Sequence, residues 1–404
     1  SKRNSIISNL VSWSLFLGLV GMLFQGMSTS EFNFADGQLV FSPMRYAWKA
    51  CIFVMAILVV QLSSREPVCG QVSEYYALLL LATLGMGFVV TTENLLGAFV
   101  ALELVSLSLY ALTALWRRNR SSAEAALKYF TFGGVSSAFL LFGISYIYGM
   151  TGSLEMREIM AHFTSMPALP PLLLVGWLLV LVGLGFKIAA APFHAWAPDV
   201  YQGAPTPVTT LLAAGSKAMG FVALFRVFLF TMESVSEEWK LVIGIIALAS
   251  MTIGNLAAIT QDDIGRMLAY SSIAQAGYIL IAVPALTDDA VSGAIAHTMV
   301  HAFMKGGAFV IVAGVGAVGL GYSLESYKGL AARSQLLALS MTVCLLSLVG
   351  IPPFAGFISK FLLFYGTLQA GLSGDTWIIA LVIAGVLNSA LSLYYYLKVI
   401  RFMY

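Results

Sequence analysis

A few ionisable side chains within long apolar stretches are the residues of this sequence that could do chemistry. Lys187 ends one apolar run of helix length, Lys217 lies near the middle of the next, and Glu103 lies at the centre of LLGAFVALELVSLSLYAL. An ionised side chain at the centre of a membrane-spanning helix costs about 2.5 to 3.5 kcal/mol on insertion scales. We therefore expect each of these residues to have a partner or a function.

Glu103 and Lys187 are candidate partners, because a buried carboxylate needs a cation nearby. Such a pair could exchange protons when a neighbouring charge moves, or it could be a structural ion pair that only fixes helix packing. Lys217 has no carboxylate in its own span. A lysine in that position suits a proton carrier, although a purely stabilising role stays open.

Prolines predict two broken helices, each beside a lysine. Pro192 and Pro198 follow Lys187 closely, within the segment GFKIAAAPFHAWAPDVYQGAPTPVTTLLAAGSK. The second break is predicted in GIPPFAGFISKF, where Pro352 and Pro353 precede Lys360. Proline inside a helix removes a backbone hydrogen bond and breaks or kinks it. An alternative for the first segment is a re-entrant loop whose lysines extend to the membrane surface.

A polar stripe is predicted in the run IAHTMVHAFMKGGAF, where His297, His301 and Lys305 follow one another at four-residue steps. This spacing places the three side chains on one face of a helix. Histidine titrates near neutral pH, so the stripe could pass protons. Two histidines four residues apart could also bind zinc, although no third ligand is close, and a hydrogen-bonded core histidine is a further alternative.

Four other charged residues are candidates near the ends of spans. Glu124 and Lys128 lie four residues apart after the run RRNR, and they predict either a salt bridge at a helix start or a proton entrance. Arg226 is expected to extend to the membrane surface, and Asp199 is expected to cap the second half of the first broken helix.

Composition places the chain among integral membrane proteins. Of its 404 residues, 59% are hydrophobic and 10% are charged, whereas about 25% are charged in soluble proteins. The net charge of +2 comes with no nucleic-acid-binding patch. Cys51, Cys69 and Cys344 are scattered, and the sequence has no Walker, dinucleotide-binding or GxSxG motif. We therefore predict no disulfide framework, metal site, redox centre or soluble catalytic domain on this chain.

Apolar runs of about 20 residues predict an all-α polytopic fold with about twelve spans. They lie near 6–27, 45–63, 75–91, 94–114, 124–149, 171–191, 206–230, 238–258, 265–285, 290–318, 335–366 and 376–400. The two breaks fall in the sixth and eleventh spans, an odd offset that gives the two segments opposite directions, which is typical of inverted repeats. We predict peripheral N-terminal helices in 1–74 and five-helix repeats in 75–230 and 238–400.

The distribution of basic residues predicts the orientation of the chain. One side of the membrane is expected to receive Lys2, Arg3, Arg65, Arg117, Arg118, Arg120, Arg266, Lys328, Arg333 and Arg401, and the other little beyond Arg157 and Lys240. Cytoplasmic loops are enriched in lysine and arginine. Both ends of the chain are therefore predicted on the cytoplasmic side.

Three segments resemble the antiporter-like membrane subunits of respiratory complex I: FKIAAAPFHAWAPDVYQGAPTPVTTLLAAGSKAMGFVALFR, ITQDDIGRMLAYSSIAQAGYIL and GIPPFAGFISKF. Within the first, DVYQGAPTPVT is most similar to the N-type subunit. The resemblance implies fourteen helices with two inverted five-helix repeats, each holding a broken helix. Twelve visible spans fit if the family's first and last helices are missing here, and the start SKRNS, without a methionine, likewise suggests that an earlier segment is absent.

The resemblance also implies which residues carry protons. By position, the family's proton-pathway residues match Glu103, Lys187, Lys217 and Lys360, whereas the stripe of 297–305 is more typical of the L and M types. It implies a subunit of an NADH:quinone oxidoreductase that moves protons, working in an energy-coupling membrane, most commonly the prokaryotic plasma or inner membrane.

The same resemblance implies partners and cofactors. It implies no cofactor on this chain, with NAD(H), FMN, iron–sulfur clusters and quinone held by partner subunits. The implied partners are M-, K-, J-, A- and H-like membrane subunits, a peripheral redox arm and the lipid bilayer. Two alternatives stay open: a subunit of a multi-subunit cation/proton antiporter or membrane-bound hydrogenase, and a structural scaffold whose buried charges only lock helices together.

Overall fold

The computed structural model of this protein describes residues 2–26, 32–34, 38–65, 71–116, 119–164, 170–231, 237, 239–319 and 321–404. In this part of the chain, eleven helices are long and apolar enough to cross a membrane. The chain divides into two compact units, Ser1–Lys187 with Gly203–Glu238 (unit 1) and Ile188–Gln202 with Trp239–Tyr404 (unit 2). The predicted all-α membrane fold is confirmed, while the division into 1–74, 75–230 and 238–400 stays a prediction.

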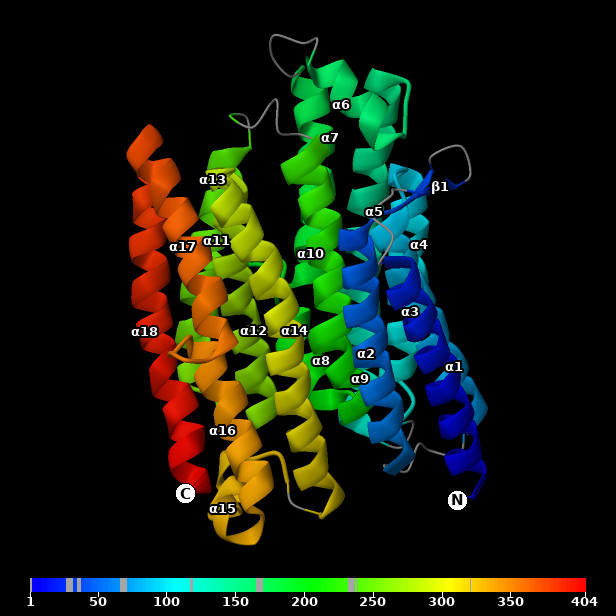
Figure 1. Ribbon diagram of the computed structural model, residues 1–404, viewed down its shortest axis with the longest axis vertical. Coiled ribbons are helices and arrows are strands. Elements are labelled where there is room, and N and C mark those ends of the chain that lie inside the picture. Colours follow the sequence, from blue (N-terminus) through cyan, green and yellow to red (C-terminus); the bar gives the residue numbers. More distant parts are fainter. Residues whose placement is uncertain are drawn as a thin grey trace. The chain divides into compact units, whose positions relative to one another are not determined.

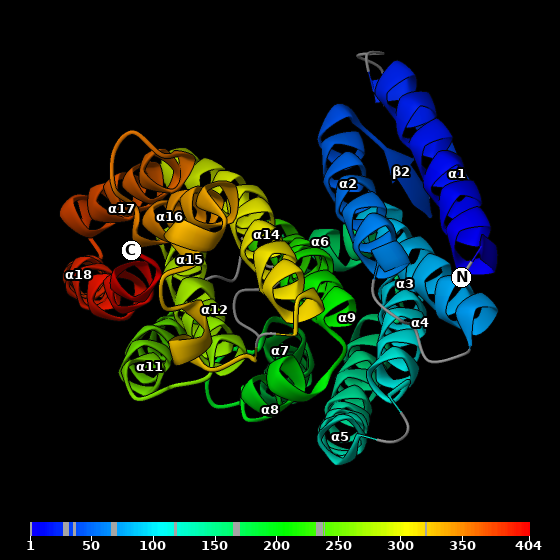
Figure 2. The same cartoon turned by 90° about the horizontal axis from the view of Figure 1, so that it is seen from below.

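Unit 1 is built from helices that pack in chain order. They are α1 (Lys2–Gly26), α2 (Pro43–Arg65), α3 (Val72–Thr91), α4 (Leu95–Thr113), α5 (Arg120–Thr151), α6 (Met156–Thr164), α7 (Pro171–Ile188), α9 (Thr206–Leu211) and α10 (Lys217–Phe225), with π-helical segments η1 (Leu212–Ser216) and η2 (Arg226–Thr231). Successive helices from α1 to α5 contact each other (Figure 2). A short antiparallel pair of strands, β1 (Phe32–Phe34) and β2 (Leu39–Phe41), connects α1 to α2.

Unit 2 is a bundle around the long helix α14. Its elements are α8 (Trp196–Gly203), α11 (Lys240–Ile259), α12 (Ile264–Leu280), α13 (Ala282–Ala285), α14 (Asp288–Ala317), the 3₁₀ turn η4 (Leu324–Tyr327), α15 (Leu330–Arg333), α16 (Gln335–Val349), α17 (Ala355–Ser373) and α18 (Trp377–Met403). Helix α14 contacts α12, α16 and α17, and α18 covers α11, α16 and α17. Figure 1 shows α16 and α17 following one another along the same direction, with a break between them.

Both predicted helix breaks are present, and the second explains the difference between twelve expected spans and eleven. The run 335–366 forms two helices, because α16 ends after 15 residues at Gly350, whose φ of 90° suits glycine. Pro352 and Pro353 occupy the break before α17. The first break follows α7, with Pro192 in the irregular segment 189–195 and Pro198 in the first turn of α8, where proline is tolerated.

Glycines let α14 and α17 approach backbone to backbone. A Cβ atom added at Gly293 would lie 2.4 Å from the amide nitrogen of Leu363, and one at Gly366 would lie 2.1 Å from the amide nitrogen of Ala290. Small residues allow this close packing between membrane helices. The contact fixes α17, and with it Lys360, against the face of α14 that carries the polar stripe.

We predict that Gly293→Ala destabilises unit 2, because the added methyl group meets backbone atoms that have no room to move. Overpacking of this kind costs about 1 to 3 kcal/mol. Gly314→Ala is the matched control on the same helix, since its Cβ would meet only Leu337 Cδ2, at 4.0 Å. Thermal unfolding of the purified variants checks this, and equal midpoints for the two variants would contradict the packing argument.

Candidate functional site

The predicted pair in unit 1 is present and lies between α4, α5 and α7. Lys187 Nζ lies 3.2 Å from Glu103 Oε1 and also donates to Ser106 Oγ, while Ser137 Oγ donates to Glu103 Oε1. Lys187 is buried, with an exposed fraction of 6%. A buried ion pair is tolerated only when hydrogen bonds satisfy its remaining groups. The two serines supply these bonds, and their hydroxyls can act both as donors and as acceptors.

Lys217 lies in the most deeply buried stretch of unit 1. Every residue from 206 to 229 is buried, and the exposed fraction of Lys217 is 2%. Lys217 begins α10, between the π-helical segments η1 and η2. Such π-helical turns are rare, and they occur frequently at functional sites. The Lys217 side chain is therefore almost fully shielded from solvent.

The predicted stripe of α14 faces the interior of unit 2. His297, His301 and Lys305 have exposed fractions of 0%, 2% and 0%. Lys305 Nζ donates to the carbonyl of Leu268 at 2.9 Å and to Ser271 Oγ at 2.6 Å, and Ser271 is in turn hydrogen-bonded to the hydroxyl of Tyr396. The cation is therefore held by oxygen atoms from α12.

Lys360 is held by the end of the broken helix. Its Nζ atom donates to the carbonyl oxygens of Leu348 at 2.9 Å and Val349 at 3.1 Å, and to Ser389 Oγ at 3.1 Å. It also lies 4.4 Å from the centre of the Tyr278 ring. The last carbonyls of a helix have no partner within it and attract cations. The break between α16 and α17 thus supplies the acceptors that a buried lysine requires.

Gln275 joins the stripe to Lys360, which the sequence analysis did not foresee. Its side chain contacts His297 Nε2 through Oε1 at 2.9 Å and donates from Nε2 to the carbonyl of Leu348 at 2.8 Å. The other nitrogen of His297, Nδ1, lies 2.9 Å from Ser359 Oγ. A signal existed, because Ser271, Gln275 and Tyr278 follow one another at helical spacing within an otherwise apolar run.

Glu124 and Lys128 lie at the surface of unit 1. Their side chains form an ion pair of 2.6 Å and are 65% and 38% exposed. An exposed pair of this kind contributes about 0 to 1 kcal/mol. The salt bridge at a helix start is thus present, and a role as a proton entrance stays a prediction.

The expectation that Arg226 extends to the membrane surface is wrong. Its guanidinium lies 3.2 Å from Glu93 Oε2 and donates to the carbonyl of Val89 at 3.0 Å, and Arg45 pairs with the other oxygen of Glu93. The contacts of Arg226 bring together residues more than 100 positions apart in the sequence, which no local pattern indicates. The result is a buried network at the end of α3.

Asp199 lies in the first turn of α8, and its carboxylate pairs with Arg266 of α12. Its Oδ1 atom accepts a hydrogen bond of 2.6 Å from Arg266 Nη1, which also reaches Gln202 Oε1 at 3.1 Å. Asp263 caps α12 by accepting from the Arg266 backbone N–H, and burial raises the pKa of this carboxyl. The cluster fastens the half-helix α8 to the rest of unit 2.

Some predicted residues fall outside what the structure describes. Cys69, Arg117 and Arg118 lie outside the described residues, as do the side chains of Lys2, Arg3 and Arg65. Among the residues that are described, no three His, Cys, Asp or Glu side chains lie close enough to hold a metal ion. Cys51 is buried and Cys344 is partly buried, and both are free thiols.

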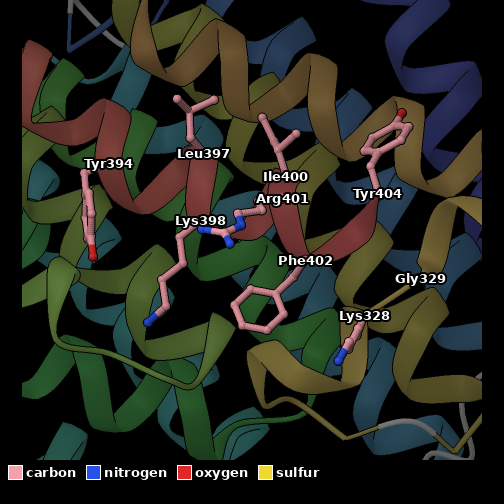
Figure 3. Close-up of a pocket in the computed structure, with 9 residues that line it drawn as sticks. All are labelled: Lys328, Gly329, Tyr394, Leu397, Lys398, Ile400, Arg401, Phe402 and Tyr404. Atoms are coloured by element: carbon pink, nitrogen blue, oxygen red, sulfur yellow. The ribbon is translucent and has the colours of Figure 1, made fainter.

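A large open pocket lies at the basic end of unit 2, away from the buried groups above. It has a volume of about 1110 Å³ and is lined by Lys328, Gly329, Tyr394, Leu397, Lys398, Ile400, Arg401, Phe402 and Tyr404 (Figure 3). Lys398 Nζ is 3.1 Å from Asp262 Oδ1. A smaller pocket of about 500 Å³ is lined by Lys360 and Ser389 together with mainly apolar side chains.

Comparison with known proteins identifies sequence relatives over most of the chain. The family model described as "NADH:quinone oxidoreductase/Mrp antiporter, TM" matches residues 92–392. The F(420)H(2) dehydrogenase subunit N of Methanosarcina mazei is 43% identical over 364 residues, covering 87% of this chain and 72% of the relative. The NADH-quinone oxidoreductase subunit N of Trichlorobacter lovleyi is 42% identical over 403 residues, covering 98% and 81%.

Solved structures agree with the sequence relatives. A chain of respiratory complex I from Thermus thermophilus with bound aureothin superposes with a TM-score of 0.83 at 35% identity, covering 99% of this chain and 85% of that one. A chain of the membrane-bound sulfane sulfur reductase, an archaeal respiratory membrane complex, gives a TM-score of 0.86 at 29% identity, covering 99% and 82%. The resemblance noted in the sequence is thereby confirmed, and the chain belongs to the NADH:quinone oxidoreductase/Mrp antiporter family of membrane proteins.

Proposed function

We propose that this chain is a proton-translocating membrane-arm subunit of an NADH:quinone oxidoreductase of the complex I type. The observation that carries the proposal is the burial of Lys187, His297 and Lys360, each hydrogen-bonded to a carboxylate or hydroxyl group that can give or take a proton. Two relatives more than 40% identical are subunit N of an NADH-quinone oxidoreductase and subunit N of an F(420)H(2) dehydrogenase. Intramembrane ionisable residues of this kind are typical of proton pathways.

In the pair of Glu103 and Lys187, the protonation state of one residue affects that of the other. A proton added to Glu103, or removed from Lys187, leaves the partner's charge uncompensated in a buried place, so the two changes favour each other. Moving one charge against 100 mV costs about 2.3 kcal/mol, and a tenfold change in proton affinity corresponds to about 1.4 kcal/mol. Modest changes in the affinities of a few buried groups are therefore sufficient for the work.

Redox chemistry belongs, in this proposal, to other subunits. NAD(H) or a related donor, FMN, iron–sulfur clusters and quinone would be held by partner chains, and M-, K-, J-, A- and H-like membrane subunits with a peripheral arm would complete the complex. The basic end of unit 2, with Lys328, Lys398 and Arg401, would face the cytoplasm, which agrees with the rule that cytoplasmic loops are positive. Both ends of the chain are proposed to lie on the cytoplasmic side of a prokaryotic plasma or inner membrane, as the distribution of basic residues along the sequence predicts.

We predict that vesicles containing the assembled complex take up or release protons only when an electron donor and a quinone are both present. NADH and reduced F420 are the donors to compare, because the named relatives use different ones. A pH-sensitive dye in the lumen measures the proton movement, and absorbance measures donor oxidation. Sodium-driven proton exchange without any donor would instead indicate an antiporter subunit and would contradict the proposal.

We predict that Glu103→Gln lowers proton translocation by about tenfold or more while the complex still assembles, because Lys187 loses the charge that balances it. A buried charge left without its partner costs about 3 to 5 kcal/mol, which disfavours the protonated form of Lys187, and each 1.4 kcal/mol is about tenfold in proton affinity. Glu158→Gln is the matched control, since that carboxylate is exposed. Loss of assembly with Glu103→Gln alone would support the scaffold alternative.

A further inference from the structure

The orientation of the Gln275 side chain is fixed by a backbone carbonyl. An amide side chain has one donor end and one acceptor end. Gln275 is buried, and its Nε2 atom lies 2.8 Å from the oxygen of Leu348. The opposite orientation would place two oxygen atoms against each other, with Lys360 donating to the same carbonyl at 2.9 Å. The acceptor end, Oε1, must therefore face His297.

This orientation assigns the proton on His297. The oxygen of Gln275 can only accept, so His297 Nε2, at 2.9 Å, must be an N–H. A neutral imidazole carries one N–H, which leaves Nδ1 as an acceptor. The neighbour of Nδ1 is Ser359 Oγ, at 2.9 Å. The position at which His297 can take up a proton is thus Nδ1, on the side of α17.

Ser359 can serve both protonation states of His297. When the imidazole is neutral, the serine hydroxyl donates to Nδ1. When Nδ1 gains a proton, the new N–H donates to Ser359 Oγ, and the hydroxyl turns to the carbonyl of Ala355 at 3.1 Å or Gly356 at 3.3 Å. One N–H bond forms and no hydrogen bond is lost. A buried group that keeps its bonds in both states can change charge at a lower cost.

Lys360 also has a serine hydroxyl beside its titratable nitrogen, that of Ser389. Its three N–H groups meet three acceptors, and Ser389 Oγ also lies 3.0 Å from the carbonyl of Val349. When the amine is neutral, Ser389 can turn and donate to its lone pair. A positive charge on Lys360 opposes a second positive charge on His297, because like charges repel. The buried titratable groups on the helices packed here are Tyr278 of α12, His301 and Lys305 of α14, Lys360 of α17, and Tyr395 and Tyr396 of α18, and Cys344 of α16 is partly buried.

We propose that Gln275 is a positioning residue that holds His297 in its Nε2–H form, so that His297 gains and loses its proton only at Nδ1, toward Ser359. Its effect on translocation rests on the proposed function. Under this assignment a proton does not pass through the ring from one nitrogen to the other. His297 takes up its proton from the α17 side and returns it to that side, where Ser359 and Lys360 are adjacent in sequence.

The test is the ¹⁵N solid-state NMR spectrum of the assembled complex in membranes, with histidine labelled in this chain. The chain has 4 histidines, and His297→Gln identifies the signal of His297 by its loss. We expect the Nε2–H form of neutral His297 to exceed the Nδ1–H form by about tenfold or more, because the other form leaves buried groups unmatched. A spectrum with the Nδ1–H form dominant, or with equal amounts, overturns the proposal.

Two variants separate positioning from general damage. Gln275→Leu should reduce the excess of the Nε2–H form by about tenfold and slow proton translocation, while the exposed Gln335→Leu should change neither. Ser359→Ala should keep the Nε2–H form, because Gln275 is intact, yet slow translocation. An unshifted spectrum in Gln275→Leu overturns the positioning role.

The readouts also keep this inference apart from the proposed function. A wild-type complex that moves no protons, yet shows the Nε2–H form and its loss in Gln275→Leu, contradicts the proposed function and leaves the assignment standing. Normal translocation in Gln275→Leu, with the spectrum shifted, overturns the claim that the assignment matters for proton movement.

Discussion

The structure depends on one constraint: a charge buried inside a membrane protein must be matched by groups that are already in place. A continuous helix has no carbonyl to spare, because each one accepts a bond from the next turn. Because α16 ends at Gly350, the carbonyls of Leu348 and Val349 are free to accept, and Lys360 donates to both of them. The irregular segment is thus what allows the lysine to be buried.

The two units match their charges in different ways. In unit 1, Lys187 faces the carboxylate of Glu103, so its charge is balanced by an opposite charge. In unit 2, Lys305 and Lys360 face carbonyl and hydroxyl oxygens, which are dipoles. Losing a proton therefore leaves a net negative charge in the first case and only unmatched dipoles in the second. The lysines of unit 2 are accordingly better suited to change charge without a partner responding.

Local sequence patterns predicted much of this arrangement. Spacing placed His297, His301 and Lys305 on one face, prolines marked both breaks, and the buried carboxylate Glu103 indicated its cation. The patterns missed α6, because nine residues are too few for a search based on membrane-spanning length. They also missed the pair of Arg226 with Glu93, because these residues meet only after α3 and η2 pack together.

The network around Glu93 shows why burial alone does not mark a proton site. Glu93 is as buried as Lys187, with exposed fractions of 7% and 6%. It is shared by Arg45 and Arg226, however, and arginine does not lose its proton in proteins. The three groups hold α3 against α2 and η2, and neither arginine can give up its proton. A lysine or histidine beside a serine hydroxyl that can turn is suited to proton exchange. The network of Arg45, Glu93 and Arg226 is suited to holding helices together.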